Sequence, residues 1–201
     1  RSDLVATLDR LGTNLLTVSA GQGLFDAGSG LTADARPMIG RIGAVEQVAS
    51  VTAVDANVYR TDLVPEEESG GISVVAADVN LLATLGASVQ SGRFLDAATA
   101  AYPATVLGAI AAARLGIARA DGTQRVWLGD EWFVVVGILA PGELAGDLDR
   151  AAVVGLPMAQ ARLGADDQPS TLYVRARPAQ IDAVADVLPA TARPDAPEEV
   201  E

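Results

Sequence analysis

The chain has 201 residues, a formal net charge of −12 and an isoelectric point near 4.3, and half of its residues are apolar. It contains no Cys and no His, and all fourteen positive charges are Arg, so Lys is absent as well. These absences exclude Ser–His–Asp and Cys–His catalysis, zinc sites of the usual kind, disulfides, lysine Schiff bases and the phosphate-binding G-x-x-x-x-G-K-[ST] loop. The acidity argues against binding to nucleic acids and to anionic lipid surfaces, because both carry charge of the same sign.

The longest uncharged stretch, residues 97–113, is interrupted by Pro103. It is shorter than the roughly 20 residues that a membrane-spanning helix needs. The sequence opens with Arg1-Ser2-Asp3, without an initiator Met or a signal peptide. We therefore expect a domain excised from a longer protein, with no membrane span of its own.

The first quarter of the chain alternates helix, strand and loop signals. Ser2 and Asp3 favour the start of a helix, apolar residues follow at helical spacing as far as Leu11, and Gly12 ends the run. The segments predicted next are a strand (14–19), a glycine-rich loop (21–30), an amphipathic helix (32–42) and a long extended segment (45–59).

Short strands and short helices make up the rest of the chain. The clearest signal is a β-hairpin, in which residues 124–128 and 132–139 flank the turn Gly129-Asp130-Glu131. The other predicted elements are a solvated hairpin tip (66–71), strands (72–77, 105–107, 151–154, 171–175), helices (81–86, 157–163, 180–188) and an Ala-rich helix ended by Gly116. The acidic tail 189–201 holds three Pro and is interpreted as a linker. This irregular alternation predicts an α+β fold with two small subdomains, the middle one inserted.

Several candidate sites are weak when their spacing is tested. Gly21-Gln22-Gly23 follows a strand, but four residues separate Gly23 from Gly28, which breaks the dinucleotide-binding pattern. Glu143, Asp147 and Asp149 lack the Gly that a calcium loop needs at its turn. The acidic runs 66–68 and 166–167 are typical of solvated loops. We therefore assign no catalytic, cofactor-binding or metal-ligating residue and expect no cofactor.

Trp127 and Trp132 both lie in the predicted hairpin, each next to apolar residues. Because either face of this hairpin could then be covered, the pattern favours packing of both Trp side chains in the core. Contact of the hairpin with a partner protein is the alternative interpretation.

A series of short motifs follows in order along the chain. They are Leu11-Gly12-Thr13-Asn14-Leu15-Leu16-Thr17-Val18, Leu85-Gly86, Ser91-Gly92-Arg93-Phe94, Thr105-Val106-Leu107-Gly108, Ala113-Arg114-Leu115-Gly116 and Asp121-Gly122 followed by the hairpin of residues 126–139. Together these motifs resemble the extracytoplasmic core domain of MacB/FtsX-type ABC transporter permeases. The resemblance covers nearly the whole chain, rests mostly on Gly and apolar residues, and transfers no active-site residue. Among the charged motif residues we single out Arg93, which we expect to clamp a loop, with a partner contact as the alternative.

The resemblance implies a domain on the extracytoplasmic side of the cell membrane, between the first two transmembrane helices of a permease. It implies a porter-like β-α-β base formed by both chain ends (1–60 and 146–190), an inserted mixed α/β subdomain (61–145) and a linker (191–201) toward the next span. We then expect a non-catalytic domain that transmits ATP-driven motion and contacts substrate or partner proteins. The implied partners are a second permease subunit, the same or a paralogue, a cytoplasmic ATPase acting through the spans, and an extracytoplasmic accessory protein.

Two other function classes remain open at this point. One is an extracytoplasmic binding module for an apolar ligand or a lipoprotein, which an exposed apolar groove would favour. The other is a carboxylate-dependent hydrolase, which a partly buried acid pair with one raised pKa would favour. The permease interpretation further predicts that Ser2 and Pro194 lie on one face of the domain and that the isolated domain is monomeric or weakly dimeric. The absence of Lys and the broken glycine pattern predict that nucleotides do not bind.

Overall fold

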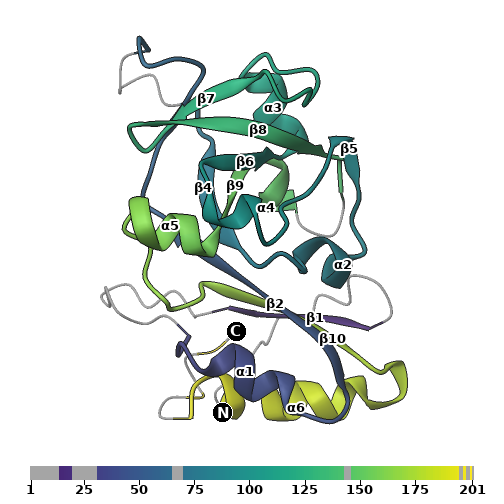
Figure 1. The fold of residues 1–201 in the computed structure, drawn as a ribbon. Coiled ribbons are helices and arrows are strands. Elements are labelled where there is room, and N and C mark those ends of the chain that lie inside the picture. Colours follow the sequence, from purple (N-terminus) through teal and green to yellow (C-terminus); the bar gives the residue numbers. More distant parts are fainter. Residues whose placement is uncertain are drawn as a thin grey trace. The chain divides into compact units, whose positions relative to one another are not determined.

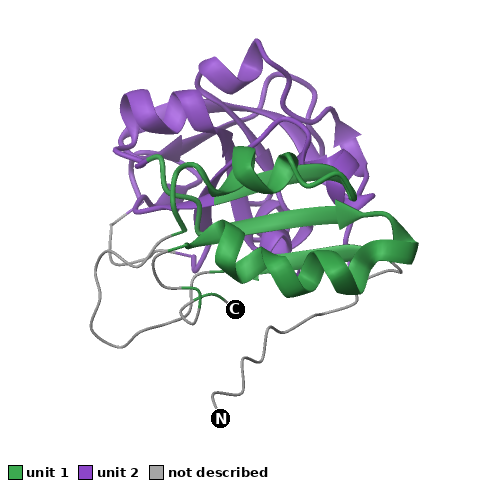
Figure 2. Cartoon of the chain, turned by 90° about the horizontal axis from the view of Figure 1, so that it is seen from below, with its two compact units in different colours: residues 1–51, 167–201 green, residues 52–166 purple. Residues whose placement is uncertain are grey.

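A computed structural model describes residues 14–19, 31–64, 70–142, 146–194, 197 and 200. The chain forms two compact units, which are coloured separately in Figure 2. Unit 1 consists of residues 1–51 and 167–201, and unit 2 of the continuous stretch 52–166. The units therefore change at residues 51/52 and 166/167, whereas the sequence placed the subdomain boundaries at 60/61 and 145/146. The helix predicted from Ser2, the loop 21–30 and the acidic run 66–68 lie outside the described residues.

The described part of unit 1 contains an antiparallel three-stranded sheet and the helices that pack on it. The strands are β1 (Leu15–Ser19), β10 (Thr171–Ala176) and β2 (Val45–Val54), whose last residues belong to unit 2. β10 lies in the middle and pairs with β1 on one side and β2 on the other. Helices α1 (Ala35–Gly40) and α6 (Ile181–Ala192), the second preceded by the 3₁₀ turn η3 (Pro178–Gln180), pack against each other on this sheet (Figure 1). Segments near both ends of the chain thus share one hydrophobic core.

The periodicity of the residues explains this packing. In β10 every second side chain is buried, beginning with Leu172, as expected for a strand with one covered face. In α6 the buried side chains recur at three- and four-residue spacing, which forms one apolar stripe. They are Ile181, Val184, Leu188 and Ala192.

Helix α6 runs past residue 189, where the sequence was expected to turn into a linker. α6 continues through Pro189 to Ala192, where the Thr191 hydroxyl donates a hydrogen bond of 2.7 Å to the Val187 carbonyl. The helix continues because Ala192 completes its apolar stripe and is fully buried. Val200, in the predicted linker, is also buried in the core of unit 1.

Unit 2 contains a mixed sheet in the order β4-β9-β6-β8-β7-β3, and β5 pairs with β8. The pairs β4/β9 and β6/β8 are parallel, and the remaining pairs in this unit are antiparallel. The strands are β3 (Val58–Tyr59), β4 (Ser73–Ala77), β5 (Val89–Gly92), β6 (Ala104–Leu107), β7 (Arg125–Leu128), β8 (Glu131–Leu139) and β9 (Ala151–Gly155).

Short helices complete unit 2 (Figure 1). They are α2 (Leu81–Leu85), η2 (Thr99–Ala101), α3 (Ala109–Arg114), α4 (Gly146–Asp149) and α5 (Leu156–Arg162). The core between sheet and helices is centred on Phe133, which is fully buried, and includes small residues of α3 and the side chain of Met158 in α5. The mixed α/β arrangement agrees with the predicted α+β class. Among the described residues, no helix combines the length and apolar character needed to cross a bilayer.

Candidate functional site

The two glycines of the motifs around residues 92 and 137 face each other between β5 and β8. Gly92 and Gly137 are register partners, and the Arg93 amide donates a hydrogen bond of 2.9 Å to the Val136 carbonyl. A Cβ on Gly137 would overlap the Arg93 carbonyl oxygen and lie 2.9 Å from its carbonyl carbon. A Cβ on Gly92 would overlap the Val136 oxygen, and its φ of +74° also favours glycine. These motif residues are explained by close backbone packing.

Arg93 acts in this contact through its backbone. Its side chain is 67% exposed and forms a 3.7 Å ion pair with Asp96 in the same loop. An exposed pair of this kind contributes little to stability, so the expected clamp is made by main-chain atoms. The motif glycine Gly108 is similar, because a Cβ there would overlap the backbone of α4 at Leu148.

The hairpin β7–β8 has a two-residue turn, Gly129-Asp130, with positive φ at both positions. This is the geometry that matches the twist of the flanking strands. The inward-facing residues of β7, among them Leu128, and Phe133 of β8 are fully buried. Trp127 and Trp132 therefore occupy the opposite face, where Trp132 is 40% exposed. The prediction that both Trp side chains pack in the core was wrong, because the strand alternation assigns the core face to their neighbours.

An aromatic row crosses three strands on this outer face. Tyr59 of β3 is the register partner of Trp127 in β7, which is the register partner of Trp132 in β8. The two indole rings meet edge to face, with centroids 5.3 Å apart and an interplanar angle of 71°. Such pairs contribute about 0.5–1.5 kcal/mol beyond burial of their area. Exposure along the row increases from Tyr59 to Trp132.

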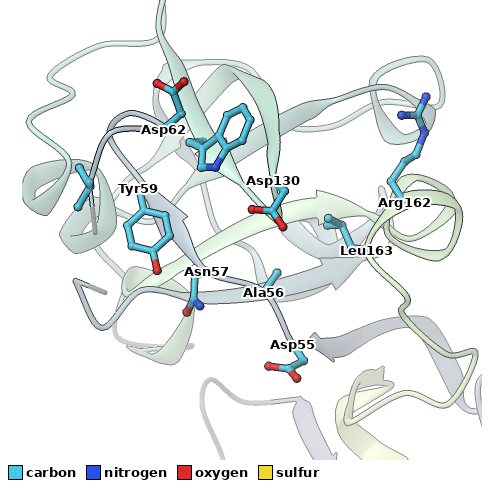
Figure 3. A pocket seen from close by; sticks show the side chains of 11 residues that line it. Asp55, Ala56, Asn57, Tyr59, Asp62, Asp130, Arg162 and Leu163 are labelled. Atoms are coloured by element: carbon cyan, nitrogen blue, oxygen red, sulfur yellow. The ribbon is translucent and has the colours of Figure 1, made fainter. Parts of the chain in front are cut away.

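A hollow of about 520 Å³ opens beside this row, within unit 2. Its lining combines the Tyr59 and Trp127 side chains with residues from the segment after β2, the hairpin turn and the end of α5. Figure 3 shows Tyr59, Asn57 and Asp130 around it, with the Arg162 guanidinium directed away. The lining residues are Asp55, Ala56, Asn57, Tyr59, Asp62, Val64, Trp127, Gly129, Asp130, Arg162 and Leu163. Sequence analysis did not identify this hollow.

The hollow is acidic. Asp55, Asp62 and Asp130 are exposed carboxylates, and within the described part of the chain no cation pairs with them. Arg162 is the cation of the lining, and its Nη1 donates a 2.8 Å hydrogen bond to Glu131. Arg60, next to the row, donates to the Arg125 carbonyl at 2.8 Å and to the Gln124 side chain at 3.2 Å. The positive charges near the hollow are therefore directed to other acceptors.

Two acidic groups away from the hollow, Asp96 and Asp121, accept hydrogen bonds from nearby threonines. The Thr99 backbone amide, followed by the Thr99 hydroxyl, lowers the pKa of Asp96. The Thr123 hydroxyl, followed by its amide, lowers the pKa of Asp121. Both shifts are opposite to the raised pKa that a general acid of a hydrolase needs.

Asp147 and Asp149 lie in α4, and the described residues contain no cluster of three or more groups suited to hold a metal ion. A second hollow of about 170 Å³ near α2 and the end of β8 has a more apolar lining that includes Leu82, Leu85 and Leu139. It is small for a ligand site, since such sites usually measure about 300–1,000 Å³.

The fold is that of known transporter domains. The periplasmic region of MacB from Actinobacillus actinomycetemcomitans matches with a TM-score of 0.70 at 12% identity, over 94% of this chain and 88% of that one. The extracellular domain of the noncanonic ABC-type transporter YknZ from Gram-positive bacteria matches with a TM-score of 0.69 at 16% identity, covering 94% and 98%. A domain of a putative permease protein from Porphyromonas gingivalis matches with a TM-score of 0.56 at 16% identity, covering 94% and 88%.

Curated proteins give no match to the sequence. The model of one protein family, however, matches residues 1–191, which is nearly the whole chain. The chain therefore belongs to the family of MacB-like periplasmic core domains, and it is an extracytoplasmic domain of an ABC transporter permease.

Proposed function

We propose that this domain is a non-catalytic transmission and interaction domain, which carries ATP-driven motion of the permease to the space outside the membrane. The family match over residues 1–191 is the observation that carries the proposal. A cytoplasmic ATPase supplies the energy, and two permease subunits bring two copies of the domain together. No chemistry at the domain is required by this role.

The organisation of the chain supports the proposal. Both ends of the chain belong to unit 1, so both connections to the rest of a permease start from one compact body. Its helices α1 and α6 pack against each other, and the Thr32 hydroxyl donates a 3.0 Å hydrogen bond to the Ala192 carbonyl. A body with one shared core responds as a unit when its connections move, as coupling between two states requires.

The test is the distance between two copies in the complete transporter. Ala183 is exposed on α6 of unit 1 and Ala113 is exposed on α3 of unit 2, and the chain has no Cys of its own. Each position is changed to Cys in a transporter without other cysteines, and a spin label is attached. We expect the distance distribution at both positions to differ between the nucleotide-free and the ATP-trapped state. Identical distributions at both positions in the two states would overturn the proposal.

A further inference from the structure

We propose that the acidic hollow beside the aromatic row is the docking site for a basic segment, rich in Arg or Lys, of an extracytoplasmic partner protein. The inference rests on the proposed function, because it names the chemistry of a partner that such a domain contacts. It concerns the hollow lined by Tyr59, Trp127 and the three carboxylates of Asp55, Asp62 and Asp130.

Charge complementarity is the first argument. The three carboxylates are exposed and have no cationic partner among the described residues, while the guanidinium of Arg162 is held by Glu131. The chain carries a net charge of −12, which attracts basic partners over longer distances. A cationic side chain entering the hollow would gain ion pairs that the described residues do not supply.

The aromatic row is the second argument. A guanidinium or ammonium group is attracted to the face of an indole or phenol ring within about 6 Å. Trp127 lines the hollow with a half-buried ring, and its register partner Tyr59 lines it too but is only 7% exposed, so Trp127 offers the accessible ring. Trp and Tyr are also the residues that most often anchor protein interfaces. Carboxylates beside aromatic rings thus match an Arg or Lys side chain better than an anion or an aliphatic chain.

Exposed apolar side chains next to the hollow favour a polypeptide as the occupant. Trp132 continues the row and is 40% exposed, and Leu63, between the lining residues Asp62 and Val64, is 86% exposed. Neither side chain lines the hollow, but each adjoins a lining residue. A free amine in the hollow would leave both in water, whereas a segment whose basic side chain enters the hollow can also cover them. The volume of about 520 Å³ accommodates such a side chain.

The test uses the fact that the only two Trp residues of the chain both belong to this row. A hexa-arginine peptide is titrated into the 201-residue chain at low salt, and the two indole N–H signals are followed by NMR. We expect saturable shifts of the Trp127 signal, and no shift with a hexa-glutamate peptide. Absence of saturable shifts with hexa-arginine would overturn the proposal, as would tighter binding of the free polyamine spermine.

Matched charge variants separate this site from general attraction. The site variant D55N/D62N/D130N removes three carboxylates that line the hollow, and Asn tolerates the positive φ of residue 130. The control variant E46Q/D182N/D186N removes three exposed carboxylates of unit 1 that do not line it. We expect the site variant to bind hexa-arginine roughly tenfold more weakly than the control variant, with far-UV circular dichroism unchanged in both. Equal affinity of the two variants would overturn the proposal.

The docking proposal and the proposed function can be refuted separately. Peptide binding to the isolated chain does not depend on ATP-driven motion, and the distance between copies does not depend on the hollow. Distances that do not change, with intact peptide binding, would contradict the transmission role alone. Distances that change, without peptide binding, would contradict the docking site alone.

Discussion

The contact between Gly137 and the Arg93 backbone gives the sharpest stability prediction. In G137A the new methyl group overlaps the Arg93 carbonyl oxygen, so β5 must move away from β8. Overpacking of this kind costs about 1–3 kcal/mol. Weakening of the hydrogen bond from the Arg93 amide to Val136 adds about 1 kcal/mol. The lower backbone entropy of Ala in the unfolded chain offsets about 0.5 kcal/mol. We therefore expect G137A to lower the free energy of unfolding by about 1.5–3.5 kcal/mol.

Urea unfolding followed by Trp fluorescence measures this effect, because both Trp residues lie in unit 2 together with Gly137. The matched control is G146A at the start of α4, where a Cβ has no neighbour within 4 Å. It is expected to equal the parent chain or to be more stable by up to about 1 kcal/mol. A loss below about 1 kcal/mol in G137A, or equal losses in both variants, would refute the close-packing explanation of these motif glycines.

Three further predictions concern core burial, acid stability and self-association. F133A should lower the free energy of unfolding by about 3–5 kcal/mol, because Phe133 is fully buried. W132A should lower it by less than about 2 kcal/mol, because Trp132 lies on the outer face. Circular dichroism in urea measures both, and equal losses would contradict the assignment of faces. The lowered pKa values of Asp96 and Asp121 stabilise the folded chain above about pH 4, and this contribution is lost as the pH falls through the folded-state pKa values. In thermal melts from pH 6 to 2.5, the melting temperature of D96N/D121N should therefore fall less steeply with pH than that of the parent chain. An equal fall in both would contradict the contribution of these two carboxylates. The isolated chain should sediment as a monomer or a weak dimer, since the net charge of −12 opposes association and salt screens it only beyond about 8 Å; a dimer that persists at nanomolar concentration would contradict this.

The sequence predicted correctly those elements whose apolar spacing and turn residues lie within one short segment. The hairpin 124–139 was expected because two alternating strands flank the turn Gly129-Asp130-Glu131, and the structure has it as β7 and β8, with Glu131 already in β8. The strand β5 was missed because Val89–Gly92 has no apolar alternation and pairs with β8 from a distance in sequence. The sequence predicted that the last helix ends at residue 188, before Pro189, because proline usually breaks a helix. In the structure α6 continues to Ala192, whose burial outweighs this local effect.

The hollow could not be predicted from sequence for a related reason. Asp55 and Asp62 flank β3, a strand of two residues, and Asp130 lies more than 60 residues later in the hairpin turn. The pairing of Tyr59 with Trp127 brings them to one place, and no local pattern encodes this pairing. The face of the Trp side chains was ambiguous because both neighbours of each are apolar or aromatic, except for Glu131. The resemblance supplied the family through motifs in which Gly92, Gly108 and Gly137 make close backbone contacts. Such contacts do not depend on the identity of surface residues.

The central claim is that the domain moves with the ATP cycle of its transporter. The most direct measurement is single-molecule fluorescence transfer between two copies labelled at Ala183→Cys, in the reconstituted transporter with its ATPase under steady hydrolysis. The account predicts that the distance alternates between two values at the frequency of ATP turnover and becomes static when the ATPase is inactivated. A distance that stays constant during hydrolysis, or fluctuates at a rate independent of ATP, would contradict it.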